Sequence, residues 1–475
     1  MPAEPARRGW SRPDLRSFRV LLPLLAAHLG LLLVFDLARH LVLSLSLLAA
    51  AFLWLPVAAR RLAAVPRPGG LILLGALLLR LLLLPLPPVL SDDVLRYLWD
   101  GKVAAAGLNP YALEPGAPEL SALRDEVTWR VPHPEIATVY PPLALAAFSI
   151  ASRFPFPVLI WKLLATAADL GACALLLHLA RRRGTPEGRV AWYAWNPLPV
   201  LEVAGMGHVD ALGVAAVVGV VLALTPRSRE EEPEAGTRLP WGPGAWAAAA
   251  VLAKLVPVLA FPLWARRSGR PFRFLLVALA LTAVALLPVA VGTGGVPPGL
   301  VKYGVSWEFN GPLYEPLWRL LDEAGLAPWI AGRLEANEAK TQDWYKWDPV
   351  YPYLYPQLLA KLLLGVGVLV TVALSLRERD LAAGTGRLFG RLMLCAATVY
   401  PWYLLWVLPW AALEGWTAWR LLSGLILLSY LAGLGGLPIW PWGWLLIWGP
   451  FAVVGAVTAS TSSRTGRYHR ASRHR

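Results

Sequence analysis

The stretch GGLILLGALLLRLLLLPLPPVLSDDVLRYLWDGK, residues 69–102, joins an apolar run directly to a cluster of acidic residues. Its first twenty residues carry a single charge, Arg80, and a transmembrane helix needs roughly 20 mostly apolar residues. The run therefore predicts a membrane span over 69–88. Asp92 and Asp93 follow it at once, so two carboxylates are expected at the boundary between the hydrocarbon core and an aqueous loop.

The whole chain has the composition of a membrane protein. Its 475 residues are 57% hydrophobic with a net charge of +14, and the basic residues cluster in short loops and at both ends, where they would face anionic lipid on the cytoplasmic side. We expect no nucleic-acid partner, because there is no basic soluble domain. The two cysteines lie within apolar runs and indicate neither a disulfide framework nor a zinc site. The first apolar run lacks a cleavage site and is expected to be a retained helix.

The apolar runs predict an all-α polytopic membrane protein with about 10–13 transmembrane helices. The first spans are expected at 18–36, 41–58 and 69–88, and two later ones at 272–291 and 351–376. The expected divisions are a cytoplasmic N-terminus (1–17), one transmembrane domain (18–457) with outer loops at 89–139 and 292–350, and a basic cytoplasmic tail (458–475).

Proline interrupts three of the apolar runs. Proline removes a helix hydrogen bond and collides with the preceding turn, and broken helices at membrane depth occur where they are buried in protein or line a wet cavity. We therefore expect a cavity near the outer face. The three runs are YPPLALAAFSIA (140–151), AAAAVLAKLVPVLAFPLW (247–264) and TVYPWYLLWVLPWAAL (398–413).

In SDDVLRYLWDGK, the spacing places Asp93, Tyr97 and Asp100 along one helical face, with Asp92 and Arg96 on the adjacent face. Acids in a first helical turn also favour the helix dipole, which explains them without any chemistry. Their position at the mouth of a hydrophobic wall suits a general base beside a lipid-borne substrate. A neighbouring carboxylate and partial burial are expected to raise the pKa of such a base.

The motifs that follow carry a resemblance by their order. The acid-rich helix is followed by LNPY and then by TVYPP, which leads into the next apolar run. The chain resembles the GT-C superfamily of polyprenyl-phosphate-sugar-dependent glycosyltransferases, and within it the mycobacterial-type mannosyltransferases. The likeness covers roughly residues 70–415 and continues through NPLPVLEVAGMGHVDAL (196–212), LAKLVPVLAFP (252–262), WEFNGPLYEPLW (307–318) and YPWYLLWVLP (400–409).

The resemblance implies a GT-C-like bundle in the inner (plasma) membrane. It implies a hexosyltransferase that moves a sugar, taken as mannose, with inversion from a polyprenyl-phosphate donor to a lipid or glycan acceptor on the extracytoplasmic face. Asp93 matches the family's base in the pattern Asp-x-x-x-Tyr, and Asp92 stays open as the alternative. For the donor phosphate we select Lys254, which is costly to place in an apolar run unless it faces an anion or a wet cavity, and then Arg96.

Further candidates for substrate contacts come from the motifs of the resemblance. Glu202, His208 and Asp210 suggest polar contacts to sugar or phosphate, with a metal site or an interhelical hydrogen bond as alternatives. His208 and Asp210 are only two residues apart, so on a regular helix they would point in different directions. No cofactor is certain, and a divalent cation is left open. The remaining candidates are Tyr97, Asp100, Asn109, Tyr111, Tyr140, Trp307, Glu308, Asn310, Trp402 and Tyr403, although aromatic residues also serve as interfacial anchors.

A transporter or flippase of lipid-linked saccharide or small molecules is the competing hypothesis, because broken helices and intramembrane charges also mark transport sites. The two large outer loops, and the gathering of polar residues near one face instead of the midplane, favour the transferase. A structural scaffold would explain neither Asp93 nor Lys254.

Overall fold

The computed structural model describes residues 18–125, 130–226, 242–340 and 350–471. Within this part of the chain the protein is helical, and its only β pairing consists of isolated bridges from Thr398 to Phe309 and Asn310. The prediction of an all-α polytopic protein is confirmed. Residues 1–17, the last residues of the basic tail and residues 227–241, which include an acidic stretch, lie outside the described residues, and the helix that enters the expected tail continues to Ala471.

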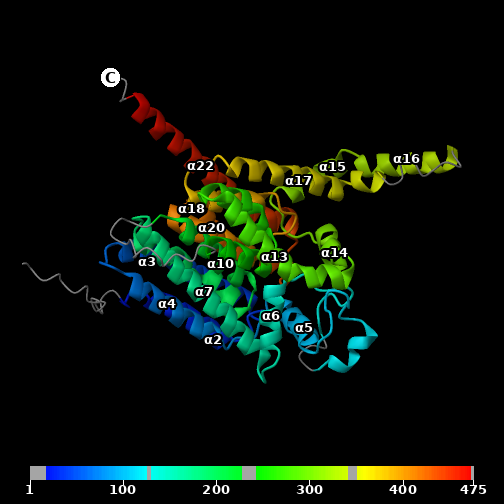
Figure 1. Ribbon diagram of the computed structural model, residues 1–475. Coiled ribbons are helices and arrows are strands. Elements are labelled where there is room, and N and C mark those ends of the chain that lie inside the picture. The colour runs from blue at the N-terminus through cyan, green and yellow to red at the C-terminus, as the bar shows by residue number, and fades with distance from the viewer. Residues whose placement is uncertain (1–17, 126–129, 227–241, 341–349, 472–475) are drawn as a thin grey trace, which may run out of the picture.

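Helices lie at the predicted spans 18–36, 41–58 and 69–88, but only the second of them is long enough to cross a membrane by itself. The helix α2 packs against both α3 and α4, and the three lie together at the lower left of Figure 1. The basic residues Arg60 and Arg61 sit in the last turn of α3. The bounds are α2 (Leu22–Val34), α3 (Leu41–Ala63) and α4 (Gly69–Leu83).

The central helices surround α10, which is buried between α7 and α11, while α11 packs on α13. On α13, Leu276, Val284 and Leu287 remain exposed, as expected for a face directed at lipid. The bounds are α6 (Pro142–Ala151), α7 (Pro157–Arg182), η2 (Glu187–Val190), α8 (Ala191–Ala194), α9 (Pro197–Pro199), η3 (Val200–Gly205), α10 (Asp210–Leu224), α11 (Gly242–Ala253), η5 (Val256–Ala260), α12 (Phe261–Arg267) and α13 (Pro271–Thr293).

The C-terminal helices complete the bundle. The helix α18 packs against α17 and α19, and α20 packs against α22. The bounds are α17 (Pro356–Ser375), α18 (Leu381–Leu394), η7 (Pro401–Trp406), α19 (Leu408–Glu414), α20 (Thr417–Leu425), η8 (Ile426–Leu428), α21 (Ser429–Gly433), η9 (Ile439–Gly443) and α22 (Trp444–Ala471).

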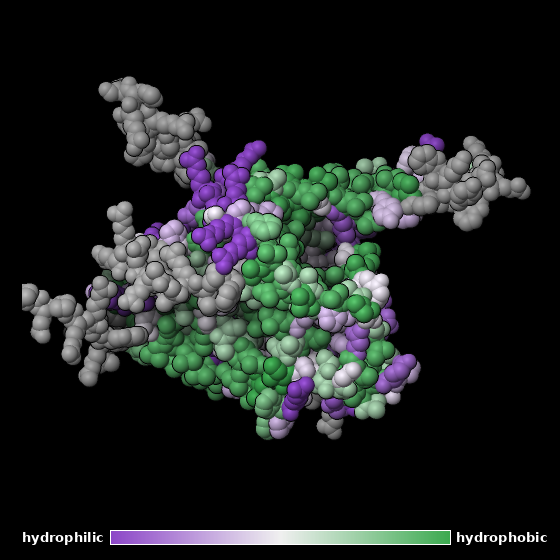
Figure 2. Space-filling model, in the orientation of Figure 1, coloured by the Kyte–Doolittle hydropathy of each residue, from purple (hydrophilic) through white to green (hydrophobic). Residues whose placement is uncertain are grey.

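Helix length agrees with a membrane bundle that contains broken segments. Among the described residues, five helices are long and apolar enough to cross a membrane, and six further apolar segments are shorter. Apolar residues cover the body of the molecule in Figure 2, and hydrophilic residues gather towards its ends. The expected spans at 272–291 and 351–376 correspond to the long helices α13 and α17.

All three proline-interrupted runs form broken or short helices, as predicted. The helix α6 has ten residues, or about 15 Å at 1.5 Å per residue, which is half of a hydrocarbon core. The helix α11 stops at Ala253, and the chain turns at Lys254 before the 3₁₀-helix η5 and then α12. The third run divides into the 3₁₀-helix η7 and the short α19. Each break exposes backbone and side chains that a straight span would bury against lipid.

The two expected outer loops contain helices of their own. The helices α5, α6 and α14 gather at the right-hand end of the bundle in Figure 1, and α16 extends beyond it. The loops touch where Lys302 of α14 donates to the Glu135 carbonyl at 3.1 Å. The bounds are α5 (Asp93–Ala105), η1 (Pro118–Leu123), α14 (Pro298–Ser306), α15 (Tyr314–Glu323), α16 (Leu326–Lys340) and η6 (Tyr351–Leu354).

Two charges within apolar runs have structural partners. Arg80 on α4 pairs with Asp169 on α7, with Nη2 and Oδ2 2.5 Å apart and both side chains fully buried, and Tyr193 donates to the same carboxylate at 2.5 Å. Lys162 donates to the carbonyls of Leu84 and Leu86 at 2.8 and 2.6 Å, just past the end of α4. A cation there complements the helix dipole. Both side chains therefore hold α4 in place and lie outside the cavity lining described below.

Replacing Arg80 by Met leaves Asp169 buried beside Tyr193 without its counter-charge. Breaking a buried pair from one side costs roughly 3–5 kcal/mol, whereas an apolar replacement of both partners is often neutral. We expect Arg80→Met to lower the melting temperature in detergent, and Arg80→Met/Asp169→Leu to recover most of the loss. Arg61→Ala, at an exposed position, is the control, and a single variant as stable as wild type would contradict this account.

Candidate active site

A cavity of about 680 Å³ lies between the first outer loop, α14, the break after α11 and residues 396–403. Both Asp93 and Lys254 line it, although they are far apart in sequence. In Figure 2 the surface is hollowed between α14 and α17, with both apolar and hydrophilic residues around the hollow. The expected cavity near the outer loops is therefore present.

Asp93 reaches the cavity because it is the first residue of α5. Its backbone N–H donates to the Ser91 hydroxyl at 3.3 Å, and its carboxylate Oδ2 accepts from the Tyr97 hydroxyl at 3.2 Å. A helix N-terminus favours negative charge. The predicted contact between Asp93 and Tyr97 is thus formed, but Asp100 lies with Arg96 instead, Nε to Oδ1 2.9 Å.

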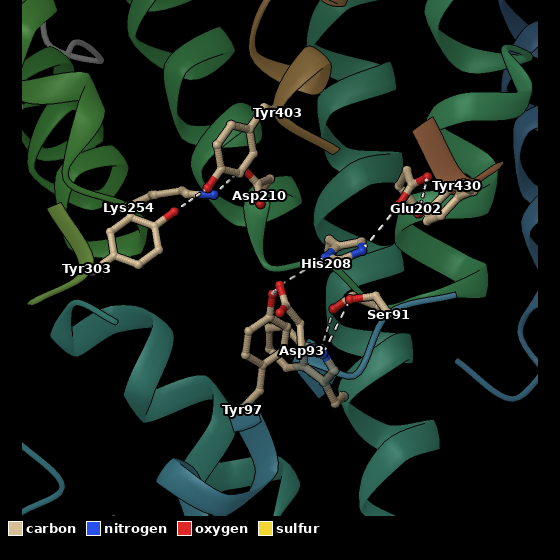
Figure 3. Close-up of polar contacts among 12 residues, drawn as sticks. Ser91, Asp93, Tyr97, Glu202, His208, Asp210, Lys254, Tyr303, Tyr403 and Tyr430 are labelled. Atoms are coloured by element: carbon tan, nitrogen blue, oxygen red, sulfur yellow. Dashed lines mark hydrogen bonds and ion pairs between the residues drawn. The ribbon is translucent and has the colours of Figure 1, made fainter. Parts of the chain in front are cut away.

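Behind Asp93 a chain of polar contacts leads into the protein (Figure 3). His208 Nδ1 lies 3.6 Å from Asp93 Oδ2, and its Nε2 lies 3.2 Å from Glu202 Oε2. The Tyr430 hydroxyl is 3.0 Å from both Glu202 oxygens. Glu202 and His208 are fully buried, so they support the cavity wall without lining it.

The backbone turn that presents His208 depends on Gly207. The π-helix η3 ends at Gly205, and Gly207 then adopts φ +79°, which is accessible to glycine without strain. An added Cβ would lie about 3 Å from Val94 and Lys162. The Trp161 indole fixes the turn by donating to the Gly207 carbonyl at 2.6 Å.

Lys254 is held at the break after α11. Its Nζ donates to Asp210 Oδ1 at 2.7 Å, and the Trp406 indole donates to the same oxygen at 2.5 Å. Nζ also lies 4.4 Å from the centroid of the Tyr403 ring, whose hydroxyl is 2.5 Å from that of Tyr303. Figure 3 shows Lys254 and the two tyrosines on one side of His208, with Asp93 below.

Aromatic rings form the wall opposite α5. His208 stacks on Trp402 with centroids 3.7 Å apart, Trp402 stacks on Tyr400 at 4.6 Å, and Tyr400 stacks on Phe309 at 4.8 Å. The β-bridges of Phe309 and Asn310 to the 396–400 segment connect this wall to the second outer loop. Flat aromatic faces beside polar groups are the usual lining of a small-ligand site.

The two adjacent aspartates have opposite pKa shifts. Burial by itself would raise the pKa of Asp93, but the contact with and charge of His208, the charge of Lys254 and the Tyr97 hydroxyl bring it below the ordinary value. Burial and then the charge of Asp93 raise the pKa of Asp92. The upward shift expected for the base is therefore found at Asp92, because Asp93 has partners for its charge and Asp92 does not share them.

Most contacts of Arg96 are with the first outer loop. Besides Asp100, its guanidinium donates to the carbonyls of Ile136 at 2.5 Å and His133 at 3.2 Å. These contacts hold residues 132–136 over the cavity. Most N–H donors of Arg96 are therefore already engaged, and this arrangement does not favour the prediction that Arg96 binds the donor phosphate.

The NPY motif also holds loop structure. Asn109 Oδ1 accepts from the Tyr111 N–H at 3.0 Å, and the Tyr111 hydroxyl donates to the Tyr140 carbonyl at 2.7 Å. Asn310 adopts φ +53° and its side chain accepts from Trp448 at 2.9 Å. These residues shape the walls from behind.

The predicted site residues thus divide into two sets. One set lines the cavity: Asp92, Asp93, Arg96, Tyr97, Tyr140, Lys254, Trp307, Trp402 and Tyr403. The other set is not among the lining residues: Asp100, Asn109, Tyr111, Glu202, His208, Asp210, Glu308 and Asn310. Sequence reasoning missed several residues of the cavity and its supports, namely His133, Trp161, Tyr303, Tyr400, Trp406 and Tyr430.

Glu202, His208 and Asp210 were also considered as a metal site, but the part of the chain that the structure describes contains no cluster of metal ligands. No group of three or more His, Cys, Asp or Glu residues there is arranged to hold a metal ion. His208 and Asp210 point to different partners, as their spacing predicted. A requirement for a divalent cation stays an untested hypothesis.

These features define a polytopic helical membrane protein with a charged cavity between broken helices and outer loops. Residues 17–267 match the family model described as alpha-(1->6)-mannopyranosyltransferase, N-terminal domain. The chain belongs to this family, and the predicted resemblance to mycobacterial-type mannosyltransferases is confirmed.

A curated relative gives the same assignment. The chain is 28% identical over 349 residues to alpha-(1->6)-mannopyranosyltransferase A of Mycobacterium tuberculosis, a match that covers 68% of this chain and 61% of the relative. It therefore spans less than two thirds of that relative's length. No solved structure gave a significant match.

The turn at Gly207 provides a test of the site's architecture. Gly207→Ala forces a side chain into a left-handed conformation and a crowded space, which costs on the order of 1–3 kcal/mol. We expect a lower melting temperature in detergent. Gly171→Ala, within α7 and with open space around it, should be neutral or stabilising. Equal melting temperatures for the two variants would contradict the role given to the turn.

Proposed function

We propose that this protein is a membrane hexosyltransferase that transfers mannose from a polyprenyl-phosphate-mannose donor to a lipid or glycan acceptor at the extracytoplasmic face. The observation that carries the proposal is that Asp93 and Lys254 line one cavity at the end of the bundle where α5 and α14 meet. One side chain can accept a proton and the other can bind an anion. Membership of the mannosyltransferase family supplies the sugar.

The transfer step needs one base and no acid. The acceptor hydroxyl gives its proton to the Asp93 carboxylate, its oxygen bonds to the anomeric carbon, and the bond from that carbon to the phosphate oxygen breaks. The pair of electrons leaves with the polyprenyl phosphate. Inversion converts a β-linked donor into an α-linked product, which agrees with the alpha linkage in the relative's name.

Asp93 suits the base better than Asp92. Its lowered pKa keeps the carboxylate ionised at neutral pH, and it lies on the cavity wall beside Tyr97 and His208. The neighbouring Asp92 is more exposed. A base must be ionised and within hydrogen-bond reach of the attacking hydroxyl.

Lys254 suits the role of stabilising the phosphate of the leaving group. Its ammonium donates to Asp210, and an ammonium has three N–H donors, so donors remain for an anion in the cavity that Lys254 lines. Preorganised donors at the point where charge develops stabilise a transition state. The hydroxyls of Tyr303 and Tyr403 lie beside it.

The apolar part of the cavity suits a lipid-borne donor. Its lining includes Leu300 of α14, Leu392 and Met393 of α18, and Leu434 after α21. On α14, beside this lining, Val301 and Val305 are exposed. A polyprenyl chain can lie against these apolar side chains while its phosphate reaches Lys254.

The arginines support an extracytoplasmic site. Arg60 and Arg61 end α3, and Arg183 lies at the end of α7, where it pairs with Glu414 and Asp380 at 2.5 and 2.8 Å. This end of the bundle is opposite to α5. Basic residues near span ends favour the cytoplasm, which leaves the cavity on the other side of the inner membrane.

Asp93→Asn removes the proposed base and retains the side chain's size. We expect transfer of radiolabelled mannose from polyprenyl-phosphate-mannose to an alkyl α-mannoside to fall by roughly 10²–10⁴-fold in membranes containing the variant. Asp92→Asn, the matched control, should keep most of the activity. The opposite ranking would make Asp92 the base, and no transfer by wild type together with movement of the lipid-linked sugar across the bilayer would favour a transporter.

Lys254→Met removes the charge that faces the donor phosphate. We expect a higher KM for the donor and a lower kcat, together roughly 10²–10³-fold in kcat/KM, with little change in the KM for the acceptor. Lys302→Met, on α14 beyond the lining residues, is the control. An acceptor-specific effect of Lys254→Met would contradict the assignment.

A further inference from the structure

Asp93 is the outer end of a contact chain that crosses four elements. It begins on α5, passes through His208 in the turn before α10, reaches Glu202 in η3 and ends at Tyr430 in α21. Glu202 and His208 are fully buried, and neither is among the residues that line the cavity. Burying an ionisable pair is costly unless its members compensate one another, so this pair requires an explanation that substrate contact does not give.

The two carboxylates beside the imidazole favour a cation at His208. Asp93 and Glu202 approach the imidazole from its two nitrogens, at 3.6 and 3.2 Å. Lys254, the neighbouring cation, is bound to a different carboxylate, that of Asp210. Opposite charges within a few ångströms favour the charged form of each group. An imidazolium at His208 therefore satisfies both carboxylates at once.

The imidazole has little freedom to turn away. One of its faces stacks on Trp402 with an interplanar angle of 14°, and the turn that carries it is fixed at Gly207 by Trp161. The Tyr430 hydroxyl holds Glu202 from the far side. The ring is thus set in position before any substrate binds.

We propose that His208, held by Glu202, is a positioning residue that orients the Asp93 carboxylate into the cavity and keeps it ionised. The inference rests on the proposed transferase function, in which Asp93 is the base. During transfer the proton moves only from the acceptor hydroxyl to Asp93, and His208 keeps its proton. Asp93 then releases its proton through the open cavity. Glu202 and His208, predicted to contact substrate, act through Asp93 instead.

Other ionisable groups face the same carboxylate and define what a pH experiment reports. They come from every element packed around it. They are Asp92 and Tyr97 on α5, Tyr140 in the first loop, Asp210 on α10, Lys254 after α11, Tyr303 on α14, Tyr400 and Tyr403 around η7, and Tyr430 on α21. Burial raises the pKa of each of these tyrosines, so they stay neutral in the working range. Because the variants below keep all of these groups, a difference from wild type in the acidic limb of the rate reports on the contact that each variant removes.

The test is the pH dependence of kcat/KM between about pH 4.5 and 8, with the full-length protein in membranes and the alkyl mannoside assay. In wild type the Asp93 pKa is depressed, so activity persists as the pH falls. In His208→Gln the imidazolium no longer opposes the effect of burial on the Asp93 pKa. We therefore expect the acidic limb of the profile, where kcat/KM falls with falling pH, to move to higher pH by about one unit or more. Glu202→Gln, which keeps the side chain's size beside Tyr430, should move it in the same direction.

His28→Gln is the matched control, because His28 is also fully buried but lies on α2 and contacts the Leu24 carbonyl. Its acidic limb should stay where wild type has it. A uniform loss of rate in His208→Gln and Glu202→Gln, with the limb unmoved, would overturn the proposal. If His208→Gln does not fold, as judged by its melting temperature, Glu202→Gln decides alone.

Asp93→Asn separates this inference from the proposed function. If Asp93→Asn loses transfer while the limb of both variants stays in place, only the positioning role of His208 fails. If Asp93→Asn retains wild-type transfer, the base assignment fails and the positioning role fails with it.

Discussion

The ionised carboxylate of Asp93 at the edge of an apolar bundle is the constraint on which the rest of the structure depends. A charge at this depth needs nearby partners, and the chain supplies the N-terminus of α5, Tyr97 and His208. His208 in turn faces a second carboxylate, that of the buried Glu202, on the other side of its ring. The pairing explains why so many ionisable residues lie in a segment that is otherwise hydrophobic.

The broken helices follow from the same requirement. A straight span through residues 247–264 would direct Lys254 at lipid or at packed side chains, whereas the break lets it meet Asp210 and the cavity. The short α6 and the 3₁₀-helix η7 likewise leave room for the loops to enter. In this arrangement one wall offers a carboxylate, another offers an ammonium, and aromatic rings form much of the remaining lining.

The sequence predicted the elements whose signals are local. Patterns of a few residues predicted the apolar runs, the proline breaks, the short helix at Asp93 and a lysine, Lys254, within an apolar run. The structure contains each of them. The pairings over long sequence distances could not be predicted. Tyr430 in LLSYLAG carries no local signal, and its contact with Glu202 depends on how α21 packs. The loop contacts of Arg96 could not be predicted for the same reason, because the carbonyls that it binds lie more than thirty residues away in the sequence.

The most direct measurement of the central claim is a cryo-electron microscopy structure of the protein with polyprenyl phosphate and an alkyl α-mannoside bound. The account requires the phosphate to contact Lys254 Nζ, and an acceptor hydroxyl to lie within about 2.6–3.2 Å of an Asp93 oxygen, with His208 still between Asp93 and Glu202. A phosphate bound away from Lys254, or an Asp93 carboxylate turned out of the cavity while both ligands are present, would contradict it.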